Sequence, residues 1–330
     1  MKETKNKIRV DFERTPLLER LKAKLINMYT VKRVVWYLFR FLLLLGISYI
    51  ILFPFFSKIT SSFMPPEDLV DVTVRLVPKH PTLDTYGAII RENSYFEALG
   101  NTFMLSFLCA IMQTFVCCFI AYGFAKFKFK GNSLLFLLVI FTMVVPHATL
   151  SLSITTKFKY FDIFGIIQLI TGSKLSLLNT NWPLYILSLT GLAYKNGLFI
   201  FMLRQFYRGI PDELEESAYL DGSGIFKTFF KIIIPLSGTM MITVFMFSFC
   251  WQWTDNFYTD ILYSITGPTL LPDIIKVPKS LNTNYAGGAL YTAAIKNACG
   301  MLIIVPLIIL YLFGQRYIIQ GIERSGLTAD

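Results

Sequence analysis

Charge is scarce in this sequence of 330 residues. Only 16% of the residues are charged, whereas an ordinary soluble domain carries about 25%. Hydrophobic residues make up 54% of the chain, which excludes disorder, and the mean hydropathy is +0.56. A water-soluble enzyme is therefore disfavoured, and the composition indicates an integral membrane protein.

Metal-binding and catalytic patterns are also missing. The two histidines and five cysteines do not have the spacing of a metal site. No glycine-rich loop ends in Gly-Lys-Ser/Thr, so we do not expect ATP to bind through a Walker A motif, and G-x-S-x-G and H-E-x-x-H are absent. We therefore expect no catalytic residue, no metal and no cofactor in this chain, and transport or membrane scaffolding as its class of function.

Long apolar stretches are abundant. A helix needs about 20 mostly apolar residues to cross the hydrocarbon core of a bilayer. The sequence predicts an all-α membrane protein with six such helices, at about 36–57, 103–123, 134–153, 183–203, 232–254 and 293–313. The fourth is the weakest, because Lys195 and Asn196 interrupt it.

Basic residues indicate the orientation of these spans. The first 33 residues hold ten of the 31 Lys and Arg residues, a pattern typical of an orientation signal and not of nucleic-acid binding. With the N-terminus inside, the cytoplasmic segments hold 19 basic residues and the opposite side nine, which predicts cytoplasmic termini. A helix opening at Thr15-Pro16 would lie on the inner leaflet, or equally would be a partner-binding or solvated helix.

These features divide the chain into five segments. We expect a cytoplasmic basic tail, a first transmembrane helix, an extracytoplasmic loop, a core with five transmembrane helices and a cytoplasmic C-terminal tail. In that order they occupy residues 1–34, 35–57, 58–102, 103–313 and 314–330.

The segment 210–236 carries the most specific pattern. Pro211 is expected to open a helix whose first turn is acidic, which suits the positive end of the helix dipole. Gly222 and Gly224 would end this helix, and a second helix with an apolar face would follow. Two short helices at an angle, projecting from a bundle of spans, are shaped to enter a cleft on another protein.

This segment closely resembles the EAA motif of permease subunits in bacterial ATP-binding-cassette (ABC) importers. The motif E-A-A-x-x-D-G-A is matched by Glu216-Ser-Ala-Tyr-Leu-Asp-Gly-Ser223, with serines at two alanine positions, and its I-x-x-P-L ending by the residues up to Leu236. The resemblance covers about residues 80–330. It is also carried by Asn101-Thr102, the stretch 121–131, Pro146, Leu203-Arg-Gln-Phe206 and Phe313-Gly-Gln-Arg-Tyr317, which together look like the carbohydrate-uptake branch, the MalG type of maltose-transporter subunit.

Two segments depart from the family pattern. Trp253-Thr-Asp-Asn-Phe257 differs from the usual W-N-D-F by a substitution and an insertion, which leaves the local geometry open. The C-terminus lacks the usual basic, glycine-rich ending, so the C-terminal contacts of the family with its ATPase are not carried over.

The resemblance implies a fold, a location and a set of partners. The fold would be the six-helix, MetI-like permease fold of type I ABC importers in the bacterial inner membrane, with a cytoplasmic coupling helix. The partners would be a second permease subunit, two copies of an ATPase subunit that bind ATP and Mg, and an extracytoplasmic solute-binding protein. The cargo would be an oligosaccharide, or alternatively a polyol or glycerol-phosphate compound. A self-sufficient secondary transporter and a membrane enzyme are the competing classes.

The resemblance also assigns residues to the coupling helix. The residues expected to contact the ATPase are Glu213, Glu216, Ser217, Ala218, Asp221, Gly222 and Phe226. Ala218 and Gly222 would permit close approach, and Glu216 and Asp221 would fix the loop or make polar contacts.

Substrate residues are predicted from the fourth and fifth spans. Lys195 lies about midway along the fourth span, where a charge costs at least about 2.5–3.5 kcal/mol unless it faces water or protein. It therefore either lines a cavity or forms a structural pair. Aromatic and amide side chains nearby could contact a sugar, although aromatic residues in spans more often pack or lie at the interface. The pathway candidates are Tyr194, Lys195, Asn196, Trp251, Gln252 and Trp253.

Overall fold

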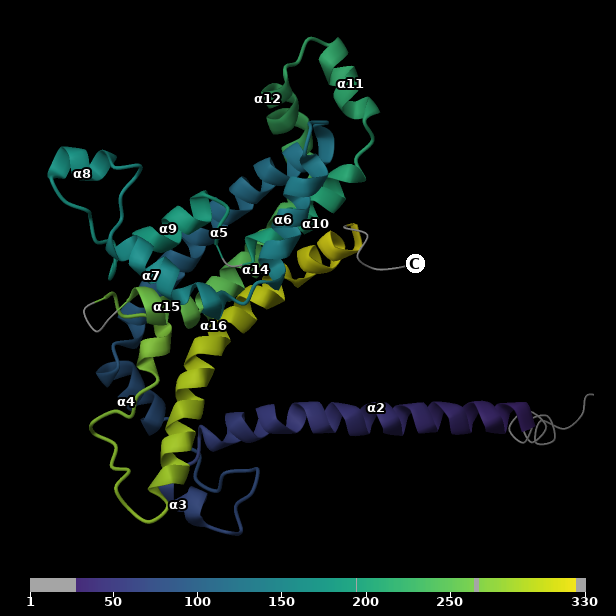
Figure 1. Cartoon of the computed structure of the whole chain (residues 1–330). Helices are drawn as coiled ribbons and strands as arrows, with labels where there is room; N and C mark the ends of the chain where they lie inside the picture. Colours follow the sequence, from purple (N-terminus) through teal and green to yellow (C-terminus); the bar gives the residue numbers. More distant parts are fainter. Residues whose placement is uncertain (1–27, 194, 264–266, 325–330) are drawn as a thin grey trace, which may run out of the picture. The chain divides into compact units, whose positions relative to one another are not determined.

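The computed structural model describes residues 28–193, 195–263 and 267–324, and the first helix forms a unit of its own (Figure 1). This helix, α2, runs over Met28–Ser61 and contains Pro54. Its most apolar window of 18 residues has a mean hydropathy of 2.2, and none of that window is buried. The predicted first span is therefore confirmed as a helix long enough to cross a membrane. The helix predicted at Thr15-Pro16 lies outside the described residues.

The second unit, residues 61–330, consists of helices joined by loops, and among its described residues the one β-type pairing is a bridge between Phe161 and Leu175. It begins with the short helices α3 (Pro66–Val70) and α4 (Asp84–Glu92). The long helix α5 (Tyr95–Lys126) follows and packs against α9, α10 and α14. The predicted loop 58–102 thus contains two helices and the start of α5.

The remaining helices follow α5 in chain order. They are α6 (Asn132–Val144), a 3₁₀ turn (His147–Leu150), α7 (Ser151–Lys159), α8 (Ile166–Thr171), α9 (Trp182–Leu189), α10 (Asn196–Arg208), α11 (Glu213–Leu220), α12 (Ile225–Thr228), a π-helical turn (Phe229–Ile233), α13 (Ile234–Leu236), α14 (Gly238–Trp253), α15 (Phe257–Leu262), a 3₁₀ turn (Leu271–Ile274) and α16 (Gly288–Arg324).

Within the described residues, three helices are long and apolar enough to span a membrane, and up to five spans result if each bent helix pair counts as one. Residues 31–61, 95–126 and 288–321 confirm the first, second and sixth predicted spans. The third is bent by 98° between α6 and the helical stretch 147–159. The fifth is bent by 76° between the stretch 225–236 and α14.

The prediction of one continuous fourth span was wrong. Helix α9 ends at Leu189 and α10 begins at Asn196, so the described residues do not form six uninterrupted spans. Gly191 and Lys195 have φ angles of +74° and +69°, in the left-handed region that no α-helix interior adopts. Helix α9 therefore ends before Gly191, and the polar pair Lys195-Asn196 marks the start of the next one.

The last helix extends beyond the predicted boundary at 313. Helix α16 continues to Arg324 because small residues let it lie close to α14: a methyl group on Gly314 would contact Met246, and one on Gly321 would contact Thr243. The Thr243 hydroxyl also donates a hydrogen bond of 2.9 Å to the carbonyl of Tyr317. The first half of the predicted C-terminal tail is thus helical and packed.

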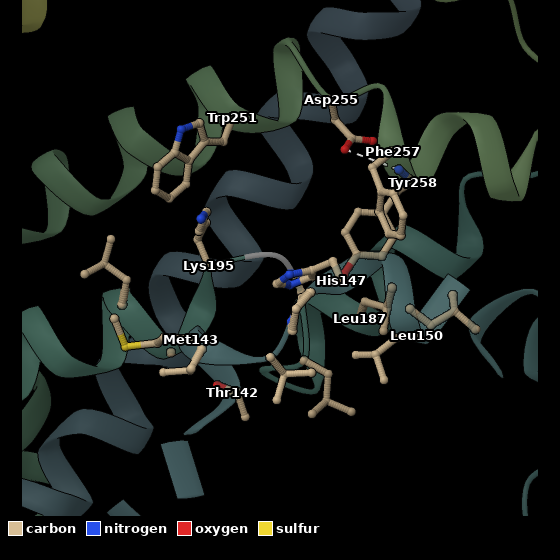
Figure 2. A pocket seen from close by; sticks show the side chains of 18 of the residues that line it. Thr142, Met143, His147, Leu150, Leu187, Lys195, Trp251, Asp255, Phe257 and Tyr258 are labelled. Carbon is tan, nitrogen blue, oxygen red and sulfur yellow. Dashed lines mark hydrogen bonds between the residues drawn. The ribbon is translucent and has the colours of Figure 1, made fainter. Parts of the chain in front are cut away.

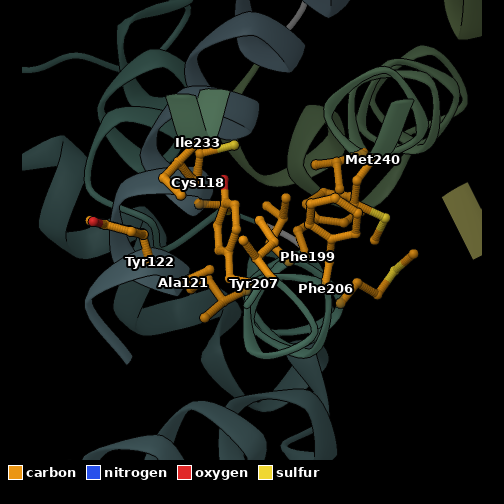
Figure 3. Close-up of a cluster of buried hydrophobic side chains, with 14 of the residues drawn as sticks. Cys118, Ala121, Tyr122, Phe199, Phe206, Tyr207, Ile233 and Met240 are labelled. Carbon is orange, nitrogen blue, oxygen red and sulfur yellow. The ribbon is translucent and has the colours of Figure 1, made fainter. Parts of the chain in front are cut away.

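An aromatic core joins α5, α10, the π-helical turn and α14 (Figure 3). Tyr207 is fully buried at its centre, and the rings of Tyr122 and Phe229 lie 4.7 Å apart. This core lies at the end of α5 from which α11 and α12 project (Figure 1). It therefore fixes the base of the projecting segment to the bundle.

Candidate functional site

The projecting segment 210–236, which we call the coupling segment, folds as its local sequence predicts. Pro211 precedes α11, and three acidic residues occupy the first turn of that helix. The helix ends in a Schellman motif, in which the amide of Ser223 donates to the Ala218 carbonyl at 2.9 Å and that of Gly222 to the Tyr219 carbonyl at 3.0 Å. Gly222 has φ +77°, which explains why glycine suits this position.

A buried ionic cluster anchors the coupling segment to the last turn of α5. The ammonium of Lys126 lies 2.6 Å from the Asp212 carboxylate and 3.5 Å from that of Glu215, and it donates a 2.7 Å hydrogen bond to the Ile210 carbonyl. The side chains of Lys126 and Glu215 are only 7% and 8% exposed. The Tyr122 hydroxyl donates to Glu215 at 3.0 Å. One lysine thus holds both the entry to α11 and its first turn.

Electrostatics within this cluster are favourable. The hydrogen bond from Lys126 lowers the pKa of the Asp212 carboxyl, so this acid stays ionised over the physiological range.

Sequence reasoning missed Glu215 and Lys126 as functional residues. The sequence does show a basic residue, Lys126, at the end of the apolar run of α5. Only the fold shows that Lys126 meets Asp212 and Glu215, which lie 86 and 89 positions later in the sequence.

The outer surface of the coupling segment combines acidic and apolar side chains. The predicted contact residues Glu213, Glu216, Ser217 and Asp221 are exposed, and Phe226 is 74% exposed. Leu220, which the prediction omitted, is 89% exposed. Ala218 is only 6% exposed because it faces the chain itself, so its side chain is not presented to a partner.

A cavity of about 1060 Å³ lies where three helices are interrupted (Figure 2). Its walls come from the end of α6, the 3₁₀ turn, the 191–198 region and the stretch from Trp251 to Tyr258. Pockets that hold drug-sized molecules measure about 300–1,000 Å³, so this cavity is at the upper end of that range. The lining is mostly apolar, with a few polar groups that converge from different elements.

Two of the predicted pathway residues face each other across this cavity. The Lys195 ammonium lies 5.1 Å from the centroid of the Trp251 ring, as Figure 2 shows. His147 and Asp255, which sequence reasoning missed, line the same cavity. The Asp255 carboxylate accepts hydrogen bonds from the amides of Tyr258 (3.3 Å) and Thr259 (3.1 Å), so it caps α15 at the rim.

The other predicted pathway residues are placed differently. Gln252 lines a small adjoining cavity of about 10 Å³ together with Trp251. Asn196 is 1% exposed and does not line the large cavity. Trp253 is 2% exposed, and its indole N–H donates to the Ile303 carbonyl at 3.0 Å, so it belongs to the packed core and does not line the large cavity. Tyr194 lies outside the described residues.

Comparisons with known proteins agree with this geometry. A family model described as "Binding-protein-dependent transport system inner membrane component" matches residues 113–324. The galactooligosaccharides transport system permease protein GanQ of Bacillus subtilis is 26% identical over 311 residues, which cover 90% of this chain and 97% of GanQ. The arabinooligosaccharides transport system permease protein AraQ of the same organism is 29% identical over 296 residues, covering 87% of this chain and 93% of AraQ.

A solved structure shows a similar fold. It is a chain of a bacterial ABC transporter involved in the import of the acidic polysaccharide alginate, and it matches with a TM-score of 0.66 at 19% identity. The match covers 88% of this chain and 99% of that chain. The arrangement of helices described above is therefore that of an ABC importer permease.

Proposed function

Because the chain belongs to the family of binding-protein-dependent transport system inner membrane components, we propose that its cavity passes an oligosaccharide and that its coupling segment docks on an ATPase subunit. The chain is a multi-pass inner-membrane permease of an ABC importer, and the ATPase of such an importer is a separate subunit. A self-sufficient transporter and a membrane enzyme are therefore not retained.

The observation that carries the docking proposal is the exposure of large apolar side chains at the tip of a coupling segment whose base is firmly anchored. Its charged anchor, Lys126 with Glu215, is buried, whereas Leu220 and Phe226 are exposed. A segment without a partner gains nothing by exposing large apolar side chains at its tip, whereas a cleft in a partner would cover them. The acidic residues around this tip would orient the segment in the cleft.

The partner set follows from this assignment. We infer a second permease that completes the pathway, two ATPase copies and an extracytoplasmic binding protein, with both termini of this chain in the cytoplasm. In this proposal α9 and α10 together cross the membrane as one interrupted span, which completes the six-helix MetI-like fold of type I importers. ATP would drive the cycle by binding the closed ATPase pair more tightly than the open pair. Closure of the pair would then move the two coupling segments toward each other.

The oligosaccharide cargo is supported by the names of the relatives and by the chemistry of the cavity. The cavity lining brings an indole ring, Trp251, together with the polar groups of Lys195, His147 and Asp255. Uptake into vesicles that contain ATP should therefore be seen with galacto- or arabinooligosaccharides and not with a polyol. If only the polyol were taken up, the proposal of an oligosaccharide cargo would be wrong, while the assignment as a permease would stand.

The docking proposal is tested with Gly222→Asp. Added bulk and charge at the end of α11 should abolish ATP-driven uptake while the chain still inserts in the membrane. Gly131→Asp is the matched control, because Gly131 also has a positive φ (+89°) and open surroundings but lies outside the coupling segment. Normal uptake by Gly222→Asp, or equal loss in both variants, would refute the docking role.

A further inference from the structure

The connection between α7 and α9, taken together with the first residue of α9 as residues 160–182, projects away from the rest of its unit (Figure 1). We call it the 160–182 excursion. At its tip Phe164 is 100% exposed, Leu169 86% and Ile170 77%. Its helix α8 has only six residues and is far too short to span a membrane. The exposed apolar side chains are thus not part of a transmembrane segment.

The backbone of the 160–182 excursion holds these side chains outward. Phe164 has φ +51°, an uncommon conformation for a bulky residue, and Gly165 follows with φ +85°. The amide of Ile167 donates to the Asp162 carboxylate at 2.9 Å, which fixes the start of α8. A conformation of this kind costs about 1–3 kcal/mol and persists only where the surrounding structure enforces it.

The base of the excursion is located by its contacts with α5. Phe158 and Leu177 pack in one cluster with Leu105, whereas the coupling segment is held by Lys126 at the other end of the same helix. About 21 residues separate these two positions, so at 1.5 Å per residue they lie about 30 Å apart. This is the thickness of the hydrocarbon core. The excursion therefore leaves the bundle at the membrane face opposite the coupling segment.

The residues around the apolar tip have the composition of a membrane interface. Lys157, Lys159 and Lys174 are exposed, and Tyr160 and Trp182 at the two ends are 54% and 60% exposed. Aromatic residues are enriched at the headgroup level, and lysines there reach the phosphates while their stems cover apolar groups. The one acid of this stretch, Asp162, is engaged by the amides of α8.

We propose that the 160–182 excursion is a lipid anchor. Phe164, Leu169 and Ile170 insert into the leaflet opposite the coupling segment, and the three lysines bind its anionic headgroups. The anchor holds α7 and α9 at a fixed depth. Since Ile154 of α7 and Leu187 of α9 line the cavity, the lipid contact supports one wall of the substrate pathway.

The test measures the surroundings of the tip in the complete importer, reconstituted in nanodiscs of phosphatidylethanolamine and phosphatidylglycerol. All five native cysteines are replaced by alanine, and a nitroxide is attached at Phe164→Cys or Leu169→Cys. The control is Val72→Cys, because Val72 is also apolar and 90% exposed but lies between α3 and α4, outside the excursion. Collisions with oxygen and with a water-soluble nickel chelate are compared at each site.

The anchor predicts frequent oxygen collisions and few nickel collisions at both tip sites, with the reverse at Val72. Tip sites as accessible to nickel as the Val72 site would overturn it. Tip sites shielded from both reagents, with or without the solute-binding protein, would also overturn it, because they would be covered by protein and not by lipid.

The role of the lysines is tested separately. A fluorophore at Phe164→Cys should be quenched more by doxyl-labelled phosphatidylglycerol than by doxyl-labelled phosphatidylcholine. Each of Lys157→Gln, Lys159→Gln and Lys174→Gln should lower this preference, by at most about fivefold per lysine. Lys79→Gln, which changes an exposed lysine outside the excursion, is the control. Equal quenching by both lipids in the parent would overturn the assignment of the lysines to headgroups.

Discussion

The coupling segment and the cavity differ in where they place polar and apolar side chains. At the base of the coupling segment a charged pair is buried, Lys126 of α5 with Glu215, whereas Leu220 and Phe226 are exposed among the acids of its outer surface. Around the cavity the helices stop and a few polar groups turn inward among apolar walls. The anchor of the coupling segment fixes this protruding segment to the bundle, and its tip exposes apolar side chains that a partner could cover. The cavity leaves room for a molecule between interrupted helices.

The backbone differs in the same way. In the coupling segment one glycine closes a continuous set of local hydrogen bonds at the end of α11. At the cavity, α6 and α7 meet at a bend of 98°, and α9 and α10 are separated by residues 190–195. Interrupted helices at membrane depth are tolerated only where protein or a water-filled cavity satisfies the freed backbone groups. Helix interruptions are thus expected where the cavity lies.

The largest expected effect comes from breaking the buried ionic cluster. Lys126→Met leaves Glu215 buried without its cation, which should cost about 3–5 kcal/mol of stability and abolish coupled uptake. Thermal unfolding in detergent and ATP-driven uptake measure the two effects. Lys130→Met, at an exposed lysine of the next connection, should change neither.

A double variant sharpens this prediction. Lys126→Met combined with Glu215→Leu removes both charges and should recover part of the lost stability, because no uncompensated charge stays buried. If the double variant is as unstable as the sum of the single variants, the two side chains are not coupled as their 3.5 Å separation indicates.

At the cavity, removal of the lysine charge should affect transport more than stability. Lys195→Met and Lys195→Gly both remove the ammonium, and each should slow uptake at saturating binding protein by about tenfold or more if it contacts the cargo. Lys195→Gly should also be the more stable of the two, because φ +69° costs about 1–2 kcal/mol for a residue with a side chain. Lys296→Met, at an exposed lysine of α16, is the control. Equal rates for wild type and both Lys195 variants would remove this residue from the pathway.

A smaller effect is expected at the wall between α6 and α10. A methyl group on Gly197 would lie 2.7 Å from the Thr142 hydroxyl oxygen and 3.0 Å from the Val139 carbonyl. Gly197→Ala should therefore push the two helices apart at a cost of about 1–3 kcal/mol and lower the melting temperature. Gly100→Ala places the same methyl group in open surroundings on α5, and we expect it to be neutral or stabilising. A neutral Gly197→Ala would show that the contact is looser than described.

The smallest effect is expected at the exposed acids of the coupling segment. Glu216→Gln should weaken ATPase binding by about 0.2–1 kcal/mol, and the difference should vanish at high salt. Pull-down of the ATPase at two ionic strengths measures this. Glu97→Gln changes an exposed acid at the opposite end of α5 and should have no effect. A salt-independent loss at Glu216 would indicate a buried contact instead.

The sequence by itself determined the membrane class, three continuous spans and the coupling segment. Spans depend on local composition, and α11 depends on a proline, an acidic turn and a glycine within a dozen residues, so short-range patterns suffice. The same patterns showed the polar pair Lys195-Asn196 inside the fourth span, but they could not show that α9 already ends at Leu189, because an average of apolar character does not locate the end of a helix.

Only the tertiary structure decided which polar residues meet. Lys126 and Glu215 are 89 positions apart, and His147 reaches the same cavity as Asp255 from another helix pair. Trp251 and Trp253 are two residues apart in one helix, so they point in different directions, and one faces the cavity while the other is buried in the core. Contacts between distant segments depend on how whole helices pack, and no local spacing encodes that packing.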